Sequence, residues 1–322
     1  RIMASFSPLE AEDVSLLDCL GQVLAEDIQS PLDLPPLSNS AMDGYAVLSA
    51  DIQGASPESP RNLEVIGLVA AGQVSNQTVV SGVAIRIMTG APIPAGADAV
   101  VPFEETDEVE RRQAGRPLDQ VAIYSSLPVG VNVRPAGEDV RRGQQVLDAG
   151  TPIRPAEIGV MASLGLTSAR VIRRPVVSIL ATGDELVASG RSLGEGKIFD
   201  SNSVSVAGSV LACGGIPRVL GIARDNMEDL NNKLTEAAGS DLIVTSAGVS
   251  KGDYDIVKDV LTERGDMNFW SVRMRPAKPL AFGHLREDGG RSVPLLGLPG
   301  NPVSTMVAFE MFARPAIRIM LG

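Results

Sequence analysis

Short apolar runs and helical segments alternate from Arg174 to Gly322, and this alternation limits the fold more than any other feature of the chain. Such runs suit strands that are buried on both faces. Parallel neighbours need a long crossover, which a helix supplies. The pattern therefore predicts an α/β domain with a doubly wound, mostly parallel sheet and right-handed crossovers. The expected strands are residues 176–180, 217–222, 242–245 and 293–296, and the expected helices are residues 200–212, 225–238, 254–264 and a segment beginning at 301.

Two of these helices carry start signals in the sequence. Asp225 and Glu228 have the spacing of a capping box, so the helix there is expected to begin at Asp225. Asn301 and Pro302 suit the N-cap and the first turn of the last helix.

The sequence pattern of residues 41–132 differs from that of the α/β region, because short β-rich runs are separated there by Gly, Pro and Asn. This predicts a small β domain of barrel or sandwich type. The polar stretches 56–62 and 108–117 are expected to be exposed loops. The expected strands are residues 63–69, 83–88, 99–103 and 121–124.

The remaining segments flank this β domain in the sequence. Residues 10–28 carry five apolar side chains at helical spacing, which predicts a helix, and three prolines that follow force an extended path. A second helix is expected at residues 155–164, ended by Gly165. The predicted division is residues 1–38 with 133–173 as an elongated helical and linker domain, 39–132 as the small β domain, and 174–322 as the α/β domain.

Acidic residues outnumber basic ones among the 322 residues, with 39 Asp and Glu against 28 Lys and Arg and a formal net charge of −11. This excess repels nucleic acids and anionic membranes, so neither is expected as a partner. An anionic small ligand stays possible because local loops can reverse the field. No apolar run is long enough to span a bilayer, and the first residues lack the apolar core of a signal peptide, so we expect a cytoplasmic location.

The chain contains one histidine, His284, and two distant cysteines, Cys19 and Cys213, which excludes a His-rich zinc site and a disulfide framework. Residues 248–252 have the Gly-x-Ser-x-Gly spacing of a hydrolase nucleophile elbow. The only base available to such a triad is His284, which falls in an apolar run expected to be a strand. Ser250 is therefore expected to hold a ligand rather than to attack one.

Three small polar loops, which begin at Thr182, Ser246 and Gly297, follow expected strands. The carboxyl ends of parallel strands meet at one edge of the sheet, where open α/β sheets bind ligands. Glycines let the backbone approach a phosphate, and helix N-termini direct N–H groups at it. Each loop alone is explained as a tight turn, but the three together favour a cleft for an anionic ligand. The candidate binding residues are Thr182, Gly183, Ser246, Gly248, Ser250, Pro299, Gly300, Asn301 and Ser304.

Acidic side chains gather at the same expected edge. Their repulsion of an anionic ligand calls for a cation, and oxygen ligands together with phosphate suit Mg²⁺. Helix capping explains Asp200 and Asp225 equally well, and a favourable helix dipole explains Asp255. The candidate acids are Asp184, Glu185, Asp200, Asp225, Asp253 and Asp255.

Residues 275–279 read Arg-Pro-Ala-Lys-Pro, a basic turn whose prolines exclude a helix. A fixed Arg275 and Lys278 can hold phosphate or another oxyanion, although a solvated turn explains them as well. On spacing alone, residues 39–47, 88–92 and 137–141 are turns. Met42, Tyr45 and Val47 are expected to belong to the core of the β domain.

Taken together, these segments resemble the MoeA family of molybdopterin molybdenumtransferases, whose eukaryotic relatives include the gephyrin E domain. These segments occur in the same order as in the family and over nearly the whole chain. Together they indicate the family far more specifically than any one segment does. The segments are residues 39–47, 88–92, 94–98, 137–139, 181–186, 198–202, 221–225, 245–255, 275–283 and 297–304.

The resemblance implies a MoaB- and MogA-like α/β domain and a reaction. Such enzymes take adenylylated molybdopterin and molybdate, cleave the phosphoanhydride with the help of Mg²⁺, release AMP and leave molybdenum on the dithiolene sulfurs. It also implies a homodimer with active sites shared between chains, and molybdopterin adenylyltransferase and molybdoenzymes as candidate protein partners. Matching positions imply catalytic roles for Asp43, Thr89, Asp139, Asp184, Glu185 and Lys278, ligand binding by Asp225 and Ser250, and metal binding by Asp184, Glu185 and Asp255, whereas Arg275, where the family commonly has Lys, is a candidate ligand-binding residue through its charge.

The sequence also departs from the family pattern. Ala247 and Ala277 stand where glycine is common, and a methyl group disfavours a positive φ and a close approach to ligand. Family members carry a further small β domain after the last helix, so an end at Gly322 is interpreted as a fragment or a shortened form. Two other functions stay open: a gephyrin-like non-catalytic binding scaffold, and a hydrolase or transferase acting on another nucleotide-linked anion.

Overall fold

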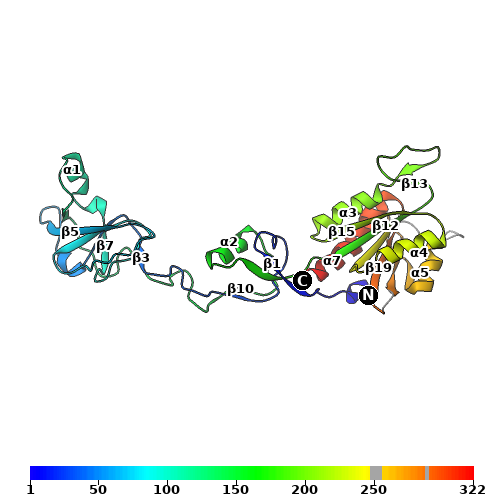
Figure 1. Ribbon diagram of the computed structural model, residues 1–322, viewed down its shortest axis with the longest axis horizontal. Helices are drawn as coiled ribbons and strands as arrows, with labels where there is room; N and C mark the ends of the chain where they lie inside the picture. Colours follow the sequence, from blue (N-terminus) through cyan, green and yellow to red (C-terminus); the bar gives the residue numbers. More distant parts are fainter. Residues whose placement is uncertain (247–255, 287–289) are drawn as a thin grey trace. The chain divides into compact units, whose positions relative to one another are not determined.

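The structure is a computed structural model, which describes residues 1–246, 256–286 and 290–322 (Figure 1). The chain forms two compact units, and we describe each by itself. One unit combines Arg1–Asp27 with Asp148–Gly322, and the other comprises Ile28–Leu147. The three-domain division expected from the sequence is finer than these two units and stays a prediction.

A six-stranded sheet organises the first unit and confirms the expected doubly wound, mostly parallel α/β fold. Four strands are parallel, and the last two in the order run antiparallel to their neighbours. In sheet order the strands are β15 (Ile216–Ala223), β12 (Val176–Thr182), β16 (Leu242–Ser246), β19 (Ser292–Leu298), β18 (Pro279–Arg286) and β17 (Gly265–Ser271).

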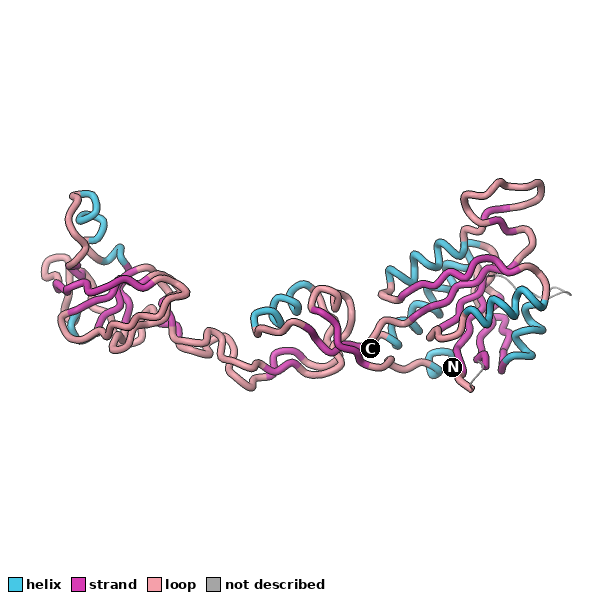
Figure 2. Tube along the Cα trace, in the orientation of Figure 1, coloured by secondary structure: helices cyan, strands magenta, loops and turns pink. Residues whose placement is uncertain are grey.

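Helices cover both faces of this sheet, because successive strand residues point to opposite sides (Figure 2). In β12, Val177 and Ile179 join the apolar cluster under α3, α6 and α7, whereas Leu180 joins the cluster under α4 and α5. Burial on both faces explains why the parallel strands are continuous apolar runs. The helices are α3 (Asn202–Ala212), α4 (Met227–Glu236), α5 (Ile256–Arg264), α6 (Pro302–Ala308) and α7 (Arg314–Met320), with a π-helical turn at Phe309–Ala313.

The order of the strands sets the position of a ligand site. From β12 the chain passes through α3 to β15 on one side, whereas from β16 it passes through α5 to β17 at the opposite edge of the sheet. The crevice outside the carboxyl ends of β12 and β16 is therefore a topological switch point, where open α/β sheets bind ligands. Because β18 is antiparallel to β19, its first residues lie at this same edge.

The sequence-based starts of two helices have different outcomes. Asn301 caps α6 as expected, since its side chain accepts hydrogen bonds from the amides of Val303 and Ser304. The expected cap at Asp225 is wrong by one residue. Asn226 precedes α4 and its side chain accepts the amide of Asp229 at 2.8 Å, which leaves Asp225 free of the capping role.

The rest of the first unit is smaller. A helix confirms the expectation at residues 155–164, as α2 (Pro155–Ser163) ends before Gly165, whose φ is +79°. The helix expected at residues 10–28 is wrong, because β1 (Ala11–Ser15) pairs with β11 (Ser168–Ile172) there. The supposed apolar stripe is not buried as one face, since Leu24 is buried but Leu17 and Leu20 are 80% and 48% exposed.

The second unit contains a five-stranded sheet and confirms the small β domain. Its strands match the expected runs, with an additional strand, β4, between β7 and β6. Tyr45 and Val47 are buried as expected, but Met42 is exposed, because it precedes β4. The strands in sheet order are β7 (Ala99–Pro102), β4 (Gly44–Val47), β6 (Val83–Ile87), β5 (Arg61–Val69) and β8 (Gln120–Ile123), and two-residue strands pair as β3 (Asn39–Ser40) with β9 (Val133–Arg134) and β2 (Ile28–Gln29) with β10 (Gln145–Leu147).

The stretch 108–117 is not only an exposed loop, which corrects the sequence-based expectation. It begins with the short helix α1 (Glu108–Gln113), and the Glu108 side chain is buried beneath it. An ion pair with Arg86 explains how a carboxylate can be buried there. In the part of the chain that the structure describes, no helix is both long enough and apolar enough to cross a membrane.

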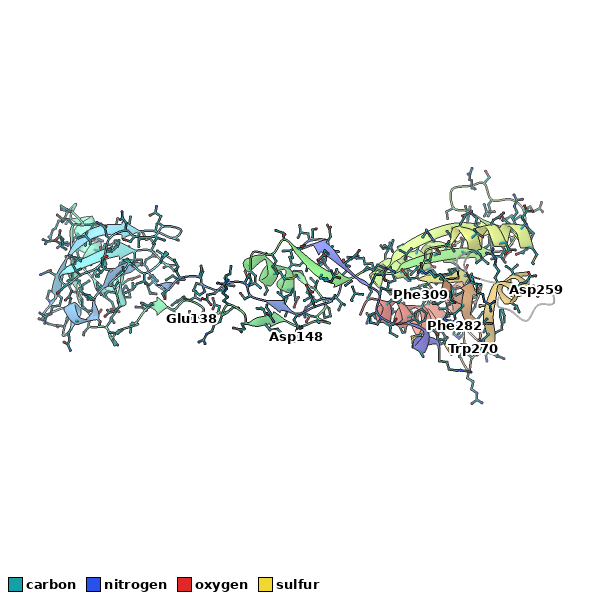
Figure 3. All side chains as sticks on the ribbon, turned by 60° about the horizontal axis from the view of Figure 1, so that its bottom comes forward. Glu138, Asp148, Asp259, Trp270, Phe282 and Phe309 are labelled. Carbon is teal, nitrogen blue, oxygen red and sulfur yellow. The ribbon has the colours of Figure 1, made fainter. Side chains whose placement is uncertain are left out.

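Tight packing between β17 and β18 gives a testable consequence. A Cβ at Gly283 would lie 2.2 Å from the Asp266 carbonyl oxygen, so we expect Gly283→Ala to lower the free energy of unfolding by about 1–3 kcal/mol. Gly208 in α3 is exposed with open space around it, and Gly208→Ala should raise it by about 0.5–1 kcal/mol. Urea unfolding followed by fluorescence of Trp270, on β17 and the only tryptophan, measures both (Figure 3). Equal midpoints for the two variants would contradict the packing.

Candidate functional site

The register of the sheet brings the carboxyl ends of three strands to one edge. Ala181 pairs with Ser246, and Ser246 pairs with Leu298, so the ends of β12, β16 and β19 lie side by side, and the described loops after β12 and β19 leave the sheet there. With strands spaced about 4.8 Å apart, roughly 14 Å separate β12 from β18 along this edge. Thr182 and Ser246 are buried, whereas Asp184 and Gly300 are exposed to solvent. The edge therefore offers a polar rim above a closed apolar core.

The loop after β12 brings two carboxylates together. The Asp184 amide donates to the Asp225 carboxylate and the Asp225 amide donates to the Asp184 carboxylate, each at 3.3 Å. The Glu185 carboxylate lies against Gly183, where a Cβ would meet it at 2.4 Å. Lys197 donates to the Asp184 carbonyl oxygen at 2.6 Å, and no described residue forms an ion pair with the carboxylates of Asp184, Glu185 or Asp225. Adjacent acids of this kind favour a bound cation.

The donor set fits Mg²⁺ rather than an all-protein metal cage. Among residues 1–246, 256–286 and 290–322, no group of three or more His, Cys, Asp and Glu side chains could hold a metal ion. Mg²⁺ commonly binds through one or two carboxylates, waters and substrate phosphate, which Asp184 and Asp225 can satisfy. Asp255, also expected at the metal, lies outside the described residues, as do Gly248, Ser250, Asp253 and Ala247.

The N-terminus of α3 adjoins the loop after β19, a contact that the sequence reasoning missed. The side-chain amide nitrogen of Asn202 (Nδ2) donates to the Gly300 carbonyl oxygen at 2.8 Å. Asp200 accepts the Ser203 amide at 3.0 Å, which supports its reading as a helix cap. Thr305 donates to the carbonyl oxygens of the same loop and fixes it from α6. Asn202 could have been predicted as a site residue from its position, because it is a polar residue in the first turn of a helix that begins at the ligand-binding edge.

The basic turn reaches this edge as well, because it joins β17 to the amino end of β18. The amide of Val272 donates to the Lys278 carbonyl oxygen at 2.7 Å and closes the turn. Ala277 adopts a φ of +71° and is buried, so the extra methyl group does not prevent the left-handed conformation. The side chains of Arg275 and Lys278 are exposed, and no described residue pairs with either, so both can bind an anion.

His284 lies away from this edge. It pairs with Pro294, four residues before the end of β19, so roughly 13 Å of strand separates it from the rim. Its ring packs edge-on against Phe282 at 5.5 Å. His284 is thus a strand residue, as expected, and a nucleophile elbow at residues 248–252 gains no support from it.

In the second unit, Asp43 and Thr89 form a close pair. Both the amide and the hydroxyl of Thr89 donate to one oxygen of the Asp43 carboxylate, at 2.7 and 2.8 Å. These two bonds, with a smaller contribution from the charge of Arg86, hold the pKa of Asp43 below its usual value. Asp139 accepts two hydrogen bonds from Arg134, at 3.0 and 3.1 Å, and is exposed. Asp43 is thus an ionised acceptor at neutral pH.

An acidic and basic rim at the switch point of a doubly wound sheet is typical of an α/β protein that binds a ligand at this edge. Residues 1–165 match the family described as "MoeA N-terminal region (domain I and II)", and residues 178–319 match "Probable molybdopterin binding domain". The chain belongs to the MoeA family of molybdopterin molybdenumtransferases. It is an enzyme of that class, with a role in molybdenum-cofactor biosynthesis.

Similar proteins cover most of the chain. The chain is 40% identical to "Molybdopterin molybdenumtransferase 2" of Mycobacterium tuberculosis, over 96% of this chain and 75% of that protein. It is 38% identical to "Molybdopterin molybdenumtransferase" of Haemophilus influenzae, over 98% of this chain and 74% of that protein. A crystal structure of the MoeA protein from Pyrococcus horikoshii superimposes with a TM-score of 0.79 at 30% identity, over all of this chain and 77% of that one.

The hydrogen bonds to Asp43 predict its titration. Thr89→Val removes one donor to the ionised carboxylate, so the pKa of Asp43 should rise toward its ordinary value of about 3.9. The remaining Thr89 amide keeps the shift partial. A carbon-13 NMR titration of the Asp43 carboxyl group measures it, and Thr89→Ser, which keeps the hydroxyl, is the control. An unchanged pKa in Thr89→Val would exclude the hydroxyl as a cause.

Proposed function

We propose that this enzyme inserts molybdenum from molybdate into adenylylated molybdopterin and releases AMP, in a reaction that depends on Mg²⁺. One observation carries the proposal: the strand register brings two loops, two acids and a basic turn to a single edge of the sheet. The family names of molybdenumtransferases and of a molybdopterin-binding domain support the substrate. The retained acids favour an enzyme over a binding scaffold.

The charges at this edge suit the substrates. Adenylylated molybdopterin and molybdate are both anions, and the backbone near Gly300 can approach phosphate oxygens without side-chain hindrance. Lys278 and Arg275 offer unpaired positive charge for a second oxyanion, such as molybdate. When bound, Mg²⁺ would polarise the phosphoanhydride and neutralise charge on the departing AMP. Asp184 and Asp225, with Glu185 beside them, would hold it.

The residues Asp43, Thr89 and Asp139 act, in this proposal, from a second copy of the chain. They lie in the unit Ile28–Leu147, whereas the sheet edge belongs to the other unit. A homodimer whose cleft is completed by the partner's small β unit gives these residues access to the substrate.

Substitutions at the edge test the reaction. Asp184→Asn and Lys278→Ala should each lower the rate of AMP release at least about 100-fold, because each removes charge that acts on the transition state. AMP is measured in the presence of adenylylated molybdopterin, molybdate and Mg²⁺, and chelation of Mg²⁺ should stop its release. Lys233→Ala, at an ion pair on the exposed face of α4, is the matched control and should keep the wild-type rate. Wild-type rates in both edge variants would remove the site assignment.

A mixture of two inactive variants tests the shared site. If Asp43 acts in trans, a dimer of one Asp43→Asn chain and one Lys278→Ala chain keeps one intact site. Random pairing makes half of all dimers mixed, so co-expression should restore about a quarter of the wild-type rate. If both residues act within one chain, the mixture stays inactive, which would exclude the shared site but leave the reaction untouched.

A further inference from the structure

A buried cation lies directly behind the Asp43–Thr89 pair. The Arg86 side chain on β6 is only 11% exposed, and its partner Glu108 on α1 is 3% exposed. The guanidinium Nε lies 2.7 Å from one Glu108 oxygen, and Nη2 donates to the other at 3.2 Å. Burial disfavours the Glu108 charge, but hydrogen bonds from Tyr45, Arg86 and Arg112 outweigh it and lower the pKa of that carboxyl group. The Glu108 carboxyl group is therefore ionised beside the guanidinium.

Two aromatic rings fix the same guanidinium. Its central carbon lies 5.4 Å from the centre of the Tyr45 ring and 5.6 Å from that of Phe103. Tyr45 is the cross-strand neighbour of Arg86 in the β4–β6 pair, and Phe103 directly follows β7. Cation–π contacts with both rings add to the ion pair and leave the guanidinium little freedom to move.

The remaining donor connects the two chain segments that carry the pair. Arg86 Nη1 donates to the carbonyl oxygen of Gly44 at 3.1 Å and to that of Ile87 at 2.9 Å. Gly44 directly follows Asp43, and Ile87 precedes Thr89 by two residues. Gly44 and Ile87 also face each other in the sheet register. One nitrogen therefore bridges the strand ends from which Asp43 and Thr89 extend.

An ion pair that served only to bury Glu108 would not need this bridge. Arg112 already reaches the same carboxylate from the surface at 2.9 Å, with a side chain that is 58% exposed. Only a planar guanidinium with donors on several sides can bind Glu108 and both carbonyl oxygens together, and a lysine ammonium cannot reproduce that geometry.

We propose that Arg86 is a positioning residue of the active site, which holds the backbone at Gly44 and Ile87 so that Asp43 stays hydrogen-bonded to Thr89. The inference rests on the proposed catalytic roles of Asp43 and Thr89. Glu108 acts through Arg86, since it neutralises the charge of the guanidinium and sets its direction. Loss of Arg86 lets the two strand ends separate and misplaces the carboxylate.

The test avoids an unpaired buried charge. The double variant Arg86→Met/Glu108→Leu removes both charges and keeps the apolar volume, so it should fold. We expect its kcat for AMP release to fall about 10- to 100-fold with KM within about twofold, as for a displaced catalytic group. Arg86→Lys should lie between this variant and the wild type. Arg112→Met removes a contact to the same carboxylate without touching the bridge and should keep the wild-type kcat.

A second readout does not depend on activity. The Thr89 amide proton, which is bonded to the Asp43 carboxylate, should shift upfield in NMR spectra of the double variant and stay unchanged in Arg112→Met. A wild-type kcat and an unchanged Thr89 amide in the double variant would overturn the positioning role. Full activity of Asp43→Asn would instead overturn the proposed catalytic role of Asp43, whatever the amide of Thr89 does, and a wild-type protein that releases no AMP would overturn the proposed function. The two failures are therefore distinguishable.

Discussion

Parallel hydrogen bonding between β12 and β16 is the constraint on which the α/β unit depends. The chain leaves these neighbours toward opposite edges of the sheet, so no crossover closes the space beyond their carboxyl ends. Acids after β12 and the loop after β19 face that space, and the antiparallel β18 brings Lys278 to it. A reversed β18 would carry the basic turn to the other end of the sheet, where His284 and Pro294 lie.

Much of the α/β fold could be predicted from the sequence because burial on both faces makes strands continuously apolar and the intervening helices carry clear end signals. The same logic failed at residues 10–28, where apolar spacing imitates a helix but a distant strand supplies the hydrogen bonds. It failed again at 108–117, since polar composition conceals a helix whose first residue, Glu108, is buried by a charge partner on β6. In both cases the deciding partner is remote in the sequence.

The candidate site, like the fold, could be predicted only in part from the sequence. Loops at strand ends and the basic turn could be located from the sequence, because topology alone carries them to one edge. Contacts made by carboxylates with backbone amides could not. The backbone amides of Asp184 and Asp225 each donate to the other residue's carboxylate, and Asp241 accepts the Val176 amide while Arg173 binds it with two nitrogens. Several acids of this strongly anionic chain thus serve as structural acceptors, which reduces the repulsion that an anionic ligand meets.

The pairing of β1 with β11 has a consequence for synthesis on the ribosome. Asp13 and Arg170, which form an ion pair between these strands, are 157 residues apart. At about 5–20 residues per second, β1 waits on the order of 10 s or more before its partner emerges. The unit Ile28–Leu147 is complete by then and can fold with its own contacts. During translation the unit Ile28–Leu147, which is inserted between the two segments of the other unit, can therefore fold before β1 pairs with β11.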